Sequence, residues 1–160
     1  MRLNSTTIKI WDYKNLKYDQ NIILKFKNYC KKKGLIFLLS NNFKLAIKLN
    51  LDGAYIPSFN NEINHLNYSL NKKFIIIGSA HNLKEIKTKE TQKVDQIVLS
   101  SLFKKNKNYL GLYKFKILKK ITKKNVIALG GISNNNLKQL TLAKCNSFAG
   151  ISFFEKKKGP

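Results

Sequence analysis

The stretch Asn125–Phe153, NVIALGGISNNNLKQLTLAKCNSFAGISF, decides the fold of this chain. It begins with a short apolar run, Val126–Leu129, which is too brief for a helix and is typical of a buried strand. Gly130 and Gly131 follow directly, and a glycine pair after a strand predicts a tight turn. Such a turn either presents backbone N–H groups to a phosphate or is a turn without a ligand.

The remainder of this stretch predicts a helix and a second strand. Ser133 occupies a position typical of a helix N-cap, and Leu137 and Leu140 are spaced to lie on one helical face. Phe148–Ile151 is apolar again and is interpreted as a strand. Strand, helix and strand in this order form a βαβ unit, so we expect the two strands to be parallel.

Upstream, short apolar runs alternate with segments whose apolar spacing favours helices. The predicted strands are Ile8–Trp11, Leu35–Leu39, Gly53–Ile56, Phe74–Ile77, Ile97–Leu99, Val126–Leu129 and Phe148–Ile151. This alternation predicts an α/β fold with a parallel sheet buried on both faces. Units of about 20 residues fit a (β/α) TIM-type barrel, although a complete barrel has eight strands. Three explanations for the seven strands remain possible: the barrel is open at one seam, another chain closes it, or the first unit is missing.

Polar residues ahead of the apolar stripes are predicted to begin the helices. These N-caps are Asp19, then Asn41 or Asn42, and then His81 or Asn82. Gly34 follows three lysines and is predicted to end the first helix.

Length and composition predict a single domain that spans residues 1–160. An apolar fraction of 43% supplies a hydrophobic core and argues against disorder. The longest apolar runs are far shorter than a membrane span, and the first ten residues lack a signal-peptide core, which favours a cytoplasmic protein. Cys30 and Cys145 are too few to define a disulfide framework.

The net charge of +23 raises the question of nucleic-acid binding. All but one of the 31 basic residues are lysine, whereas base readout and bidentate phosphate contacts prefer arginine. The lysines are also spread along the whole chain, which favours solvated helix faces. Nucleic acid is therefore an unlikely partner, and the charge instead favours small anionic, phosphorylated substrates.

Five segments in this order resemble the thiamine phosphate synthase and TenI family. They are Leu45–Ala46 with Leu51–Ile56, Gly78–Asn82, Asp95–Phe103, Ile127–Ile132 and Ala149–Ser152. IALGGI at residues 127–132 matches the family's segment closely. The resemblance implies an eight-stranded TIM-type barrel, and it implies that this chain is short of the N-terminal βα unit, the family's first strand and helix, before Ile8. It also implies a Mg²⁺-assisted transferase that joins hydroxymethylpyrimidine diphosphate to thiazole phosphate, giving thiamine phosphate and pyrophosphate.

The resemblance assigns the thiazole-phosphate site to Gly130, Gly131, Ile151 and Ser152. Barrels commonly bind phosphate in the loops after their seventh and eighth strands, which agrees with this placement. Ser79 matches the serine that lies near the pyrimidine and the pyrophosphate in the family, and His81 matches the neighbouring histidine. A structural reading remains open for both, with Ser79 capping a helix and His81 filling a turn.

The diphosphate side of the family's site is changed in this sequence. The family's basic pair falls on Trp11 and Tyr13, and Lys14, one residue further, can substitute as a point charge. The family's two Mg²⁺ aspartates fall on Asn41 and Asn60, whose amides lack the negative charge that a hard cation favours. The weak, diverged metal site would therefore consist of two amides.

The family's threonine-rich loop is replaced by a lysine- and asparagine-rich segment. Lys105 and Lys107 in this segment are candidate diphosphate contacts. The histidine of TenI relatives, which aromatise thiazole phosphate by moving a proton, falls on Ser101, so that base is absent.

The sequence thus predicts a thiamine phosphate synthase-type transferase with Ser79 and Lys14 as catalytic residues and Mg²⁺ as cofactor. A TenI-like or catalytically degenerate phosphate-binding protein is the alternative, and a Lys-rich nucleic-acid-binding module is a remote one. The expected partners are small phosphorylated substrates and no membrane. A second copy of the chain could close the seam of an incomplete barrel.

Overall fold

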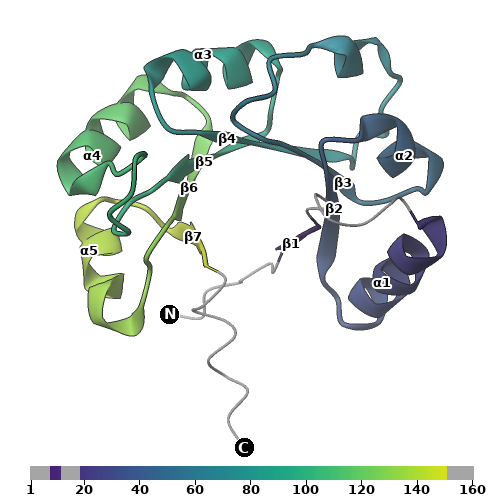
Figure 1. The fold of residues 1–160 in the computed structure, drawn as a ribbon, viewed down its shortest axis with the longest axis horizontal. Helices are drawn as coiled ribbons and strands as arrows, with labels where there is room; N and C mark the ends of the chain where they lie inside the picture. The colour runs from purple at the N-terminus through teal and green to yellow at the C-terminus, as the bar shows by residue number, and fades with distance from the viewer. Residues whose placement is uncertain (1–7, 12–18, 151–160) are drawn as a thin grey trace, which may run out of the picture. The chain divides into compact units, whose positions relative to one another are not determined.

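The computed structural model describes residues 8–11 and 19–150 (Figure 1). The chain divides into two compact units after Ile76. The strands are β1 (Ile8–Trp11), β2 (Ile36–Ser40), β3 (Gly53–Ile56), β4 (Ile75–Ala80), β5 (Gln96–Ser100), β6 (Asn125–Leu129) and β7 (Ser147–Ala149). The helices are α1 (Gln20–Lys32), α2 (Phe43–Lys48), α3 (Leu83–Thr91), α4 (Gly111–Ile121) and α5 (Leu137–Leu142). The alternation of strands and helices predicted from the sequence is confirmed.

In the first unit, β1, β2 and β3 are parallel, with Ile10 beside Leu38 and Leu39 beside Ala54. Its core consists of buried residues from α1, β2, α2, β3 and the loop before β3: Ile23, Cys30, Phe37, Leu39, Leu45, Ala46, Leu51 and Ala54. Gly53 has to be glycine, because a Cβ there would overlap the Ile75 carbonyl oxygen. The backbone N–H of Phe37 donates to the Asp52 carboxylate at 2.8 Å, which fastens the start of β2.

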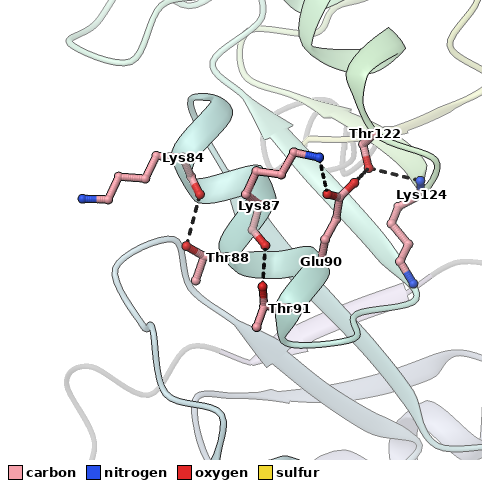
Figure 2. A network of polar contacts seen from close by, with 7 residues as sticks. All are labelled: Lys84, Lys87, Thr88, Glu90, Thr91, Thr122 and Lys124. Atoms are coloured by element: carbon pink, nitrogen blue, oxygen red, sulfur yellow. Dashed lines mark hydrogen bonds and ion pairs between the residues drawn. The ribbon is translucent and has the colours of Figure 1, made fainter.

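In the second unit, β5 and β6 are parallel, as are the β4–β5 and β6–β7 pairs. The inward residues of β5 and β6 are almost fully buried, including Ile97, Leu99 and Ala128. Glu90 on α3 accepts hydrogen bonds from Lys87 at 2.8 Å and from Thr122 at 2.7 Å (Figure 2). Since Thr122 ends α4, this carboxylate joins two neighbouring helices.

The helix starts agree with the sequence at three positions and differ at one. Asp19, Asn42 and Asn82 each accept a backbone N–H and cap α1, α2 and α3. Ser133 caps a 3₁₀ turn, Asn134–Asn136, instead of starting α5 directly. Three consecutive asparagines favour turns over α-helix, so α5 begins only at Leu137.

Across the part of the chain that the structure describes, each helix is too short or too polar to cross a lipid bilayer.

Candidate functional site

The turn after β6 places two glycines in the left-handed region of backbone space. Gly130 has a φ of 106° and Gly131 a φ of 72°. A Cβ at Gly130 would overlap the Ser101 hydroxyl, and a Cβ at Gly131 would lie 2.6 Å from the Lys104 nitrogen. Both the conformation and the close approach of residues 101–104 therefore require glycine here.

The segment after β5 is attached to this turn through carbonyl groups. Leu102 N–H donates to the Leu129 carbonyl at 2.9 Å, and Phe103 N–H donates to the Gly130 carbonyl at 2.8 Å. On the other side, the Asn136 amide donates to the Gly131 carbonyl at 2.8 Å. Among the described residues these three bonds use the carbonyls of the turn, and they fix its backbone against the segment after β5.

The structure describes one half of the predicted phosphate site, the half formed by Gly130 and Gly131. Gly131 is exposed to solvent, and the 3₁₀ turn that Ser133 caps begins shortly after it. Ile151 and Ser152, the other half of the predicted site, lie outside the described residues, as does Lys14. The assignment of the phosphate to Gly130 and Gly131 stays a prediction, and the geometry of the turn is compatible with it.

The lysine-rich segment after β5, residues 101–108, is held at its two ends by hydrogen bonds and is exposed in between. Ser101 donates from its hydroxyl to the Lys104 carbonyl at 2.8 Å, and its N–H donates to the Asn108 carbonyl at 2.8 Å. Lys105 and Lys107 are exposed between these anchors. Their ammonium groups are therefore accessible to an anion, as the predicted diphosphate contact requires.

Ser79 and His81 lie at the carboxyl end of β4. Ser79 is buried and pairs with Val98 of β5. The His81 ring, half-buried, places Nδ1 2.7 Å from the Ser100 carbonyl oxygen at the end of β5. The sequence offered no signal for this contact, because it depends on which strands are neighbours.

Asn41 and Asn60, the predicted metal positions, come together at the carboxyl ends of β2 and β3. The Asn60 amide donates to Asn41 Oδ1 at 2.5 Å, and Asn60 Oδ1 accepts the Glu62 N–H at 2.7 Å. They line a cavity of about 190 Å³ with His65 and Phe43, whose rings stack with centroids 4.4 Å apart.

This arrangement does not fit Mg²⁺. Two amide ligands would both have to turn an oxygen to the ion, whereas here one amide donates its N–H to the oxygen of the other. Within residues 8–11 and 19–150, no three His, Cys, Asp or Glu side chains gather in a way that could hold a metal. The two amides are hydrogen-bonded to each other, so this geometry does not favour the weak magnesium site expected at Asn41 and Asn60, which stays a prediction.

A parallel sheet of alternating strands and helices, with a glycine turn at the carboxyl end of β6, defines a TIM-type (β/α) protein. The chain belongs to the thiamine monophosphate synthase family, whose model matches residues 13–154. A solved thiamine phosphate pyrophosphorylase from Pyrococcus furiosus shares the fold, with a TM-score of 0.76 and 18% identity over 91% of this chain and 72% of its own. The TIM-type fold class is therefore confirmed.

Curated relatives carry the same family name. The thiamine-phosphate synthase of Persephonella marina is 27% identical over 139 residues, which cover 84% of this chain and 66% of the relative. That of Pelagibacter ubique is 29% identical over 129 residues, which cover 78% and 62%. The chain therefore spans just under two thirds of the length of these two relatives.

Proposed function

We propose that this chain is a thiamine phosphate synthase-type transferase, which joins hydroxymethylpyrimidine diphosphate to thiazole phosphate and releases pyrophosphate. The family match over residues 13–154 carries the proposal. The turn at Gly130 and Gly131 supports it, because backbone N–H groups at such a turn suit the phosphate of a small substrate.

In this proposal the backbone N–H groups of Gly130 and Gly131 bind the thiazole phosphate. The Ser79 hydroxyl donates a hydrogen bond to the pyrophosphate as it leaves. Lys105 and Lys107, both exposed, neutralise part of its charge, and Lys14 is assigned the same task. The net charge of +23 raises the local concentration of such anions.

A second candidate is a protein that binds the phosphorylated thiazole without catalysing the transfer. The hydrogen bond between Asn41 and Asn60 favours it, because this pair stands where the resemblance implies Mg²⁺ ligands. Both candidates share the phosphate site and differ only in turnover.

Incubation of the purified chain with both substrates, with and without Mg²⁺, tests the proposal. Thiamine phosphate is followed by the fluorescence of its oxidised form, and thiazole phosphate binding by calorimetry. Product formation supports the transferase, while binding without product leaves the second candidate. Failure to bind thiazole phosphate overturns both.

The proposal also treats residues 1–160 as one cytoplasmic domain that works as a homo-oligomer. Light scattering of the purified chain gives its mass in solution, and a monomeric mass overturns the oligomer.

A further inference from the structure

The solvent-facing side of α4 carries a row of apolar side chains. Tyr113 is 79% exposed, Ile117 43% and Ile121 40%. These residues are four positions apart, so they form one row along the helix that is about 12 Å long. The opposite side of α4 packs into the protein through Phe115, which is fully buried. The row is therefore additional to the apolar face that holds α4 in the fold.

Lysines border this row on both sides. With about 3.6 residues per turn, Lys116 and Lys120 lie on one side of the row and Lys114 lies on the other. All three are exposed, and none of them has an ion-pair partner within residues 8–11 and 19–150. The exposed face of α4 thus combines an apolar centre with positively charged edges.

The chain supplies no negative charge to balance these edges. From Gln96 to Gly150 the sequence contains neither Asp nor Glu. Glu90, which accepts a hydrogen bond from Thr122 at the end of α4, also accepts one from Lys87 at 2.8 Å (Figure 2). The positive charge along the face of α4 is therefore available to a negatively charged partner.

Neither a second copy nor another part of this chain suits the face. The net charge of +23 makes two copies repel each other, and a two-fold contact through α4 would bring the same lysines together. The residues outside 8–11 and 19–150 contain more Lys and Arg than Asp and Glu. The complementary molecule is therefore a different one that carries negative charge.

The relief of the face favours a protein helix over a lipid surface. Only Tyr113 stands clear of its surroundings, whereas Ile117 and Ile121 are less than half exposed. A flat bilayer would touch Tyr113 and leave most of the two isoleucines outside the contact. A second helix can instead place its own row of side chains beside this one, as ridges pack into grooves between helices.

We propose that the exposed face of α4 is a docking surface for an acidic amphipathic helix of another protein. Apolar residues of that helix pack along Tyr113, Ile117 and Ile121, and its Asp and Glu side chains pair with the lysines at the edges. One helix face buries less area than a standard protein interface, so the complex is weak and transient and forms faster through electrostatic attraction.

Two synthetic peptides test this proposal. The probe is a helical peptide with leucines at i, i+4 and i+8 and glutamates on both sides of them, and the control has the same composition with the leucines scattered around the helix. We expect the probe to bind and to shift the backbone NMR signals of Tyr113, Ile117 and Ile121, and added salt to weaken the binding. Equal binding of the two peptides overturns the proposal, because charge alone then explains it.

Variants on α4 locate the contact. Tyr113→Ser removes the most exposed apolar side chain and should weaken probe binding by about tenfold. Lys116→Glu with Lys120→Glu reverses the charge at one edge and should also weaken it by about tenfold. Lys25→Glu with Lys72→Glu changes the net charge equally at exposed positions outside α4 and should keep the affinity. Unchanged affinity in both α4 variants overturns the proposal.

Vesicles of phosphatidylglycerol test the lipid alternative. We expect vesicle binding to depend on net charge alone, so that the double variant on α4 and the double variant outside it lose it equally. A loss confined to the α4 variants makes this face a lipid-binding surface and overturns the protein partner. These measurements need no turnover, so their outcome is separate from that of the proposed transferase.

Discussion

Gly131 has a φ of 72°, and a Cβ added to it would lie 2.6 Å from the backbone nitrogen of Lys104. Gly131→Ala should lower the free energy of unfolding by about 1–3 kcal/mol and thiazole phosphate affinity by tenfold or more, because the turn must open to admit the methyl group. Gly131→Asp should abolish binding by adding negative charge against the phosphate. Denaturant titration and calorimetry measure the two effects.

Gly34 provides the matched control. Its φ of 63° is similar, but no atom lies within 4 Å of the place that an alanine methyl group would take, so Gly34→Ala tests the conformational penalty alone. We expect a loss of about 1 kcal/mol and unchanged affinity. Equal binding losses in both variants would contradict the steric role of Gly131.

The side chains of Asn41 and Asn60 should determine whether Mg²⁺ changes the thermal midpoint of the protein. The unchanged chain should have the same thermal midpoint with and without Mg²⁺, because its amide pair is already hydrogen-bonded. Asn41→Asp with Asn60→Asp places two carboxylates together, so Mg²⁺ should raise the midpoint of the double variant. Asn50→Asp is the control, because Asn50 has a φ of 49°, close to the 56° of Asn41, and it should show no such response. A magnesium response in the unchanged chain would contradict this view of the site.

Lys89 is fully buried on α3, and its ammonium group donates to the Gln92 side chain at 2.9 Å. Burial lowers the pKa of Lys89 to about 8, against 10.5 for an ordinary lysine. The unfolded chain therefore binds more protons between these values, and stability should rise as pH increases from about 8 to 10.5.

Lys89→Met should remove this rise in stability with pH. It should also stabilise the chain at pH 7 by about 3 kcal/mol, the free-energy equivalent of a pKa lowered from 10.5 to about 8. Denaturant unfolding across the alkaline range measures it. Lys84→Met, on the exposed side of the same helix, should leave the pH dependence as it is. If the stability of the Lys89→Met variant still increases between about pH 8 and 10.5, another titrating group causes the increase.

At the level of elements, the Glu90 carboxylate links α3 to Thr122 at the end of α4 (Figure 2). Hydrogen bonding from Lys87, helped by Thr122, lowers the pKa of Glu90 below 4.5. The ionised Glu90 carboxylate therefore stabilises the fold at pH values above its pKa in the unfolded chain. This stabilisation is lost as the pH falls through its pKa in the folded chain. Glu90→Gln should cost about 1 kcal/mol at pH 7 and flatten the loss of stability below pH 4.5. Acid titration of unfolding measures this, and an equally steep acid limb would contradict the assignment.

The elements themselves follow from local sequence, which explains why they could be predicted. The apolar runs indicated all seven strands, and Asp19, Asn42 and Asn82 cap helices because capping needs only a few neighbouring residues. The 3₁₀ start before α5 was missed, because a serine N-cap fits either kind of helix.

The site was only partly predictable for a different reason. The glycine turn is visible in the local sequence, whereas the contacts of His81 with Ser100 and of Asn60 with Asn41 each join residues 19 positions apart. Such pairs depend on the register of neighbouring strands, which the sequence pattern leaves undetermined.

At the level of the whole molecule, the net charge of +23 should act as a general attraction for anions. Single-stranded RNA should bind weakly and lose about 10³-fold or more in affinity between 50 and 200 mM salt, if several phosphates are contacted. Thiazole phosphate, with one phosphate, should lose far less. Calorimetry at both salt concentrations compares them, and RNA binding that resists salt would favour a nucleic-acid function.

The buried position of Lys89 also makes it a chemical reporter of unfolding. An amine acylates only when it is uncharged and reachable by the reagent, so reagents that label the exposed lysines of the native chain should spare this one. Brief acylation followed by peptide mass spectrometry would then count how often α3 opens, through a single residue that the native fold conceals.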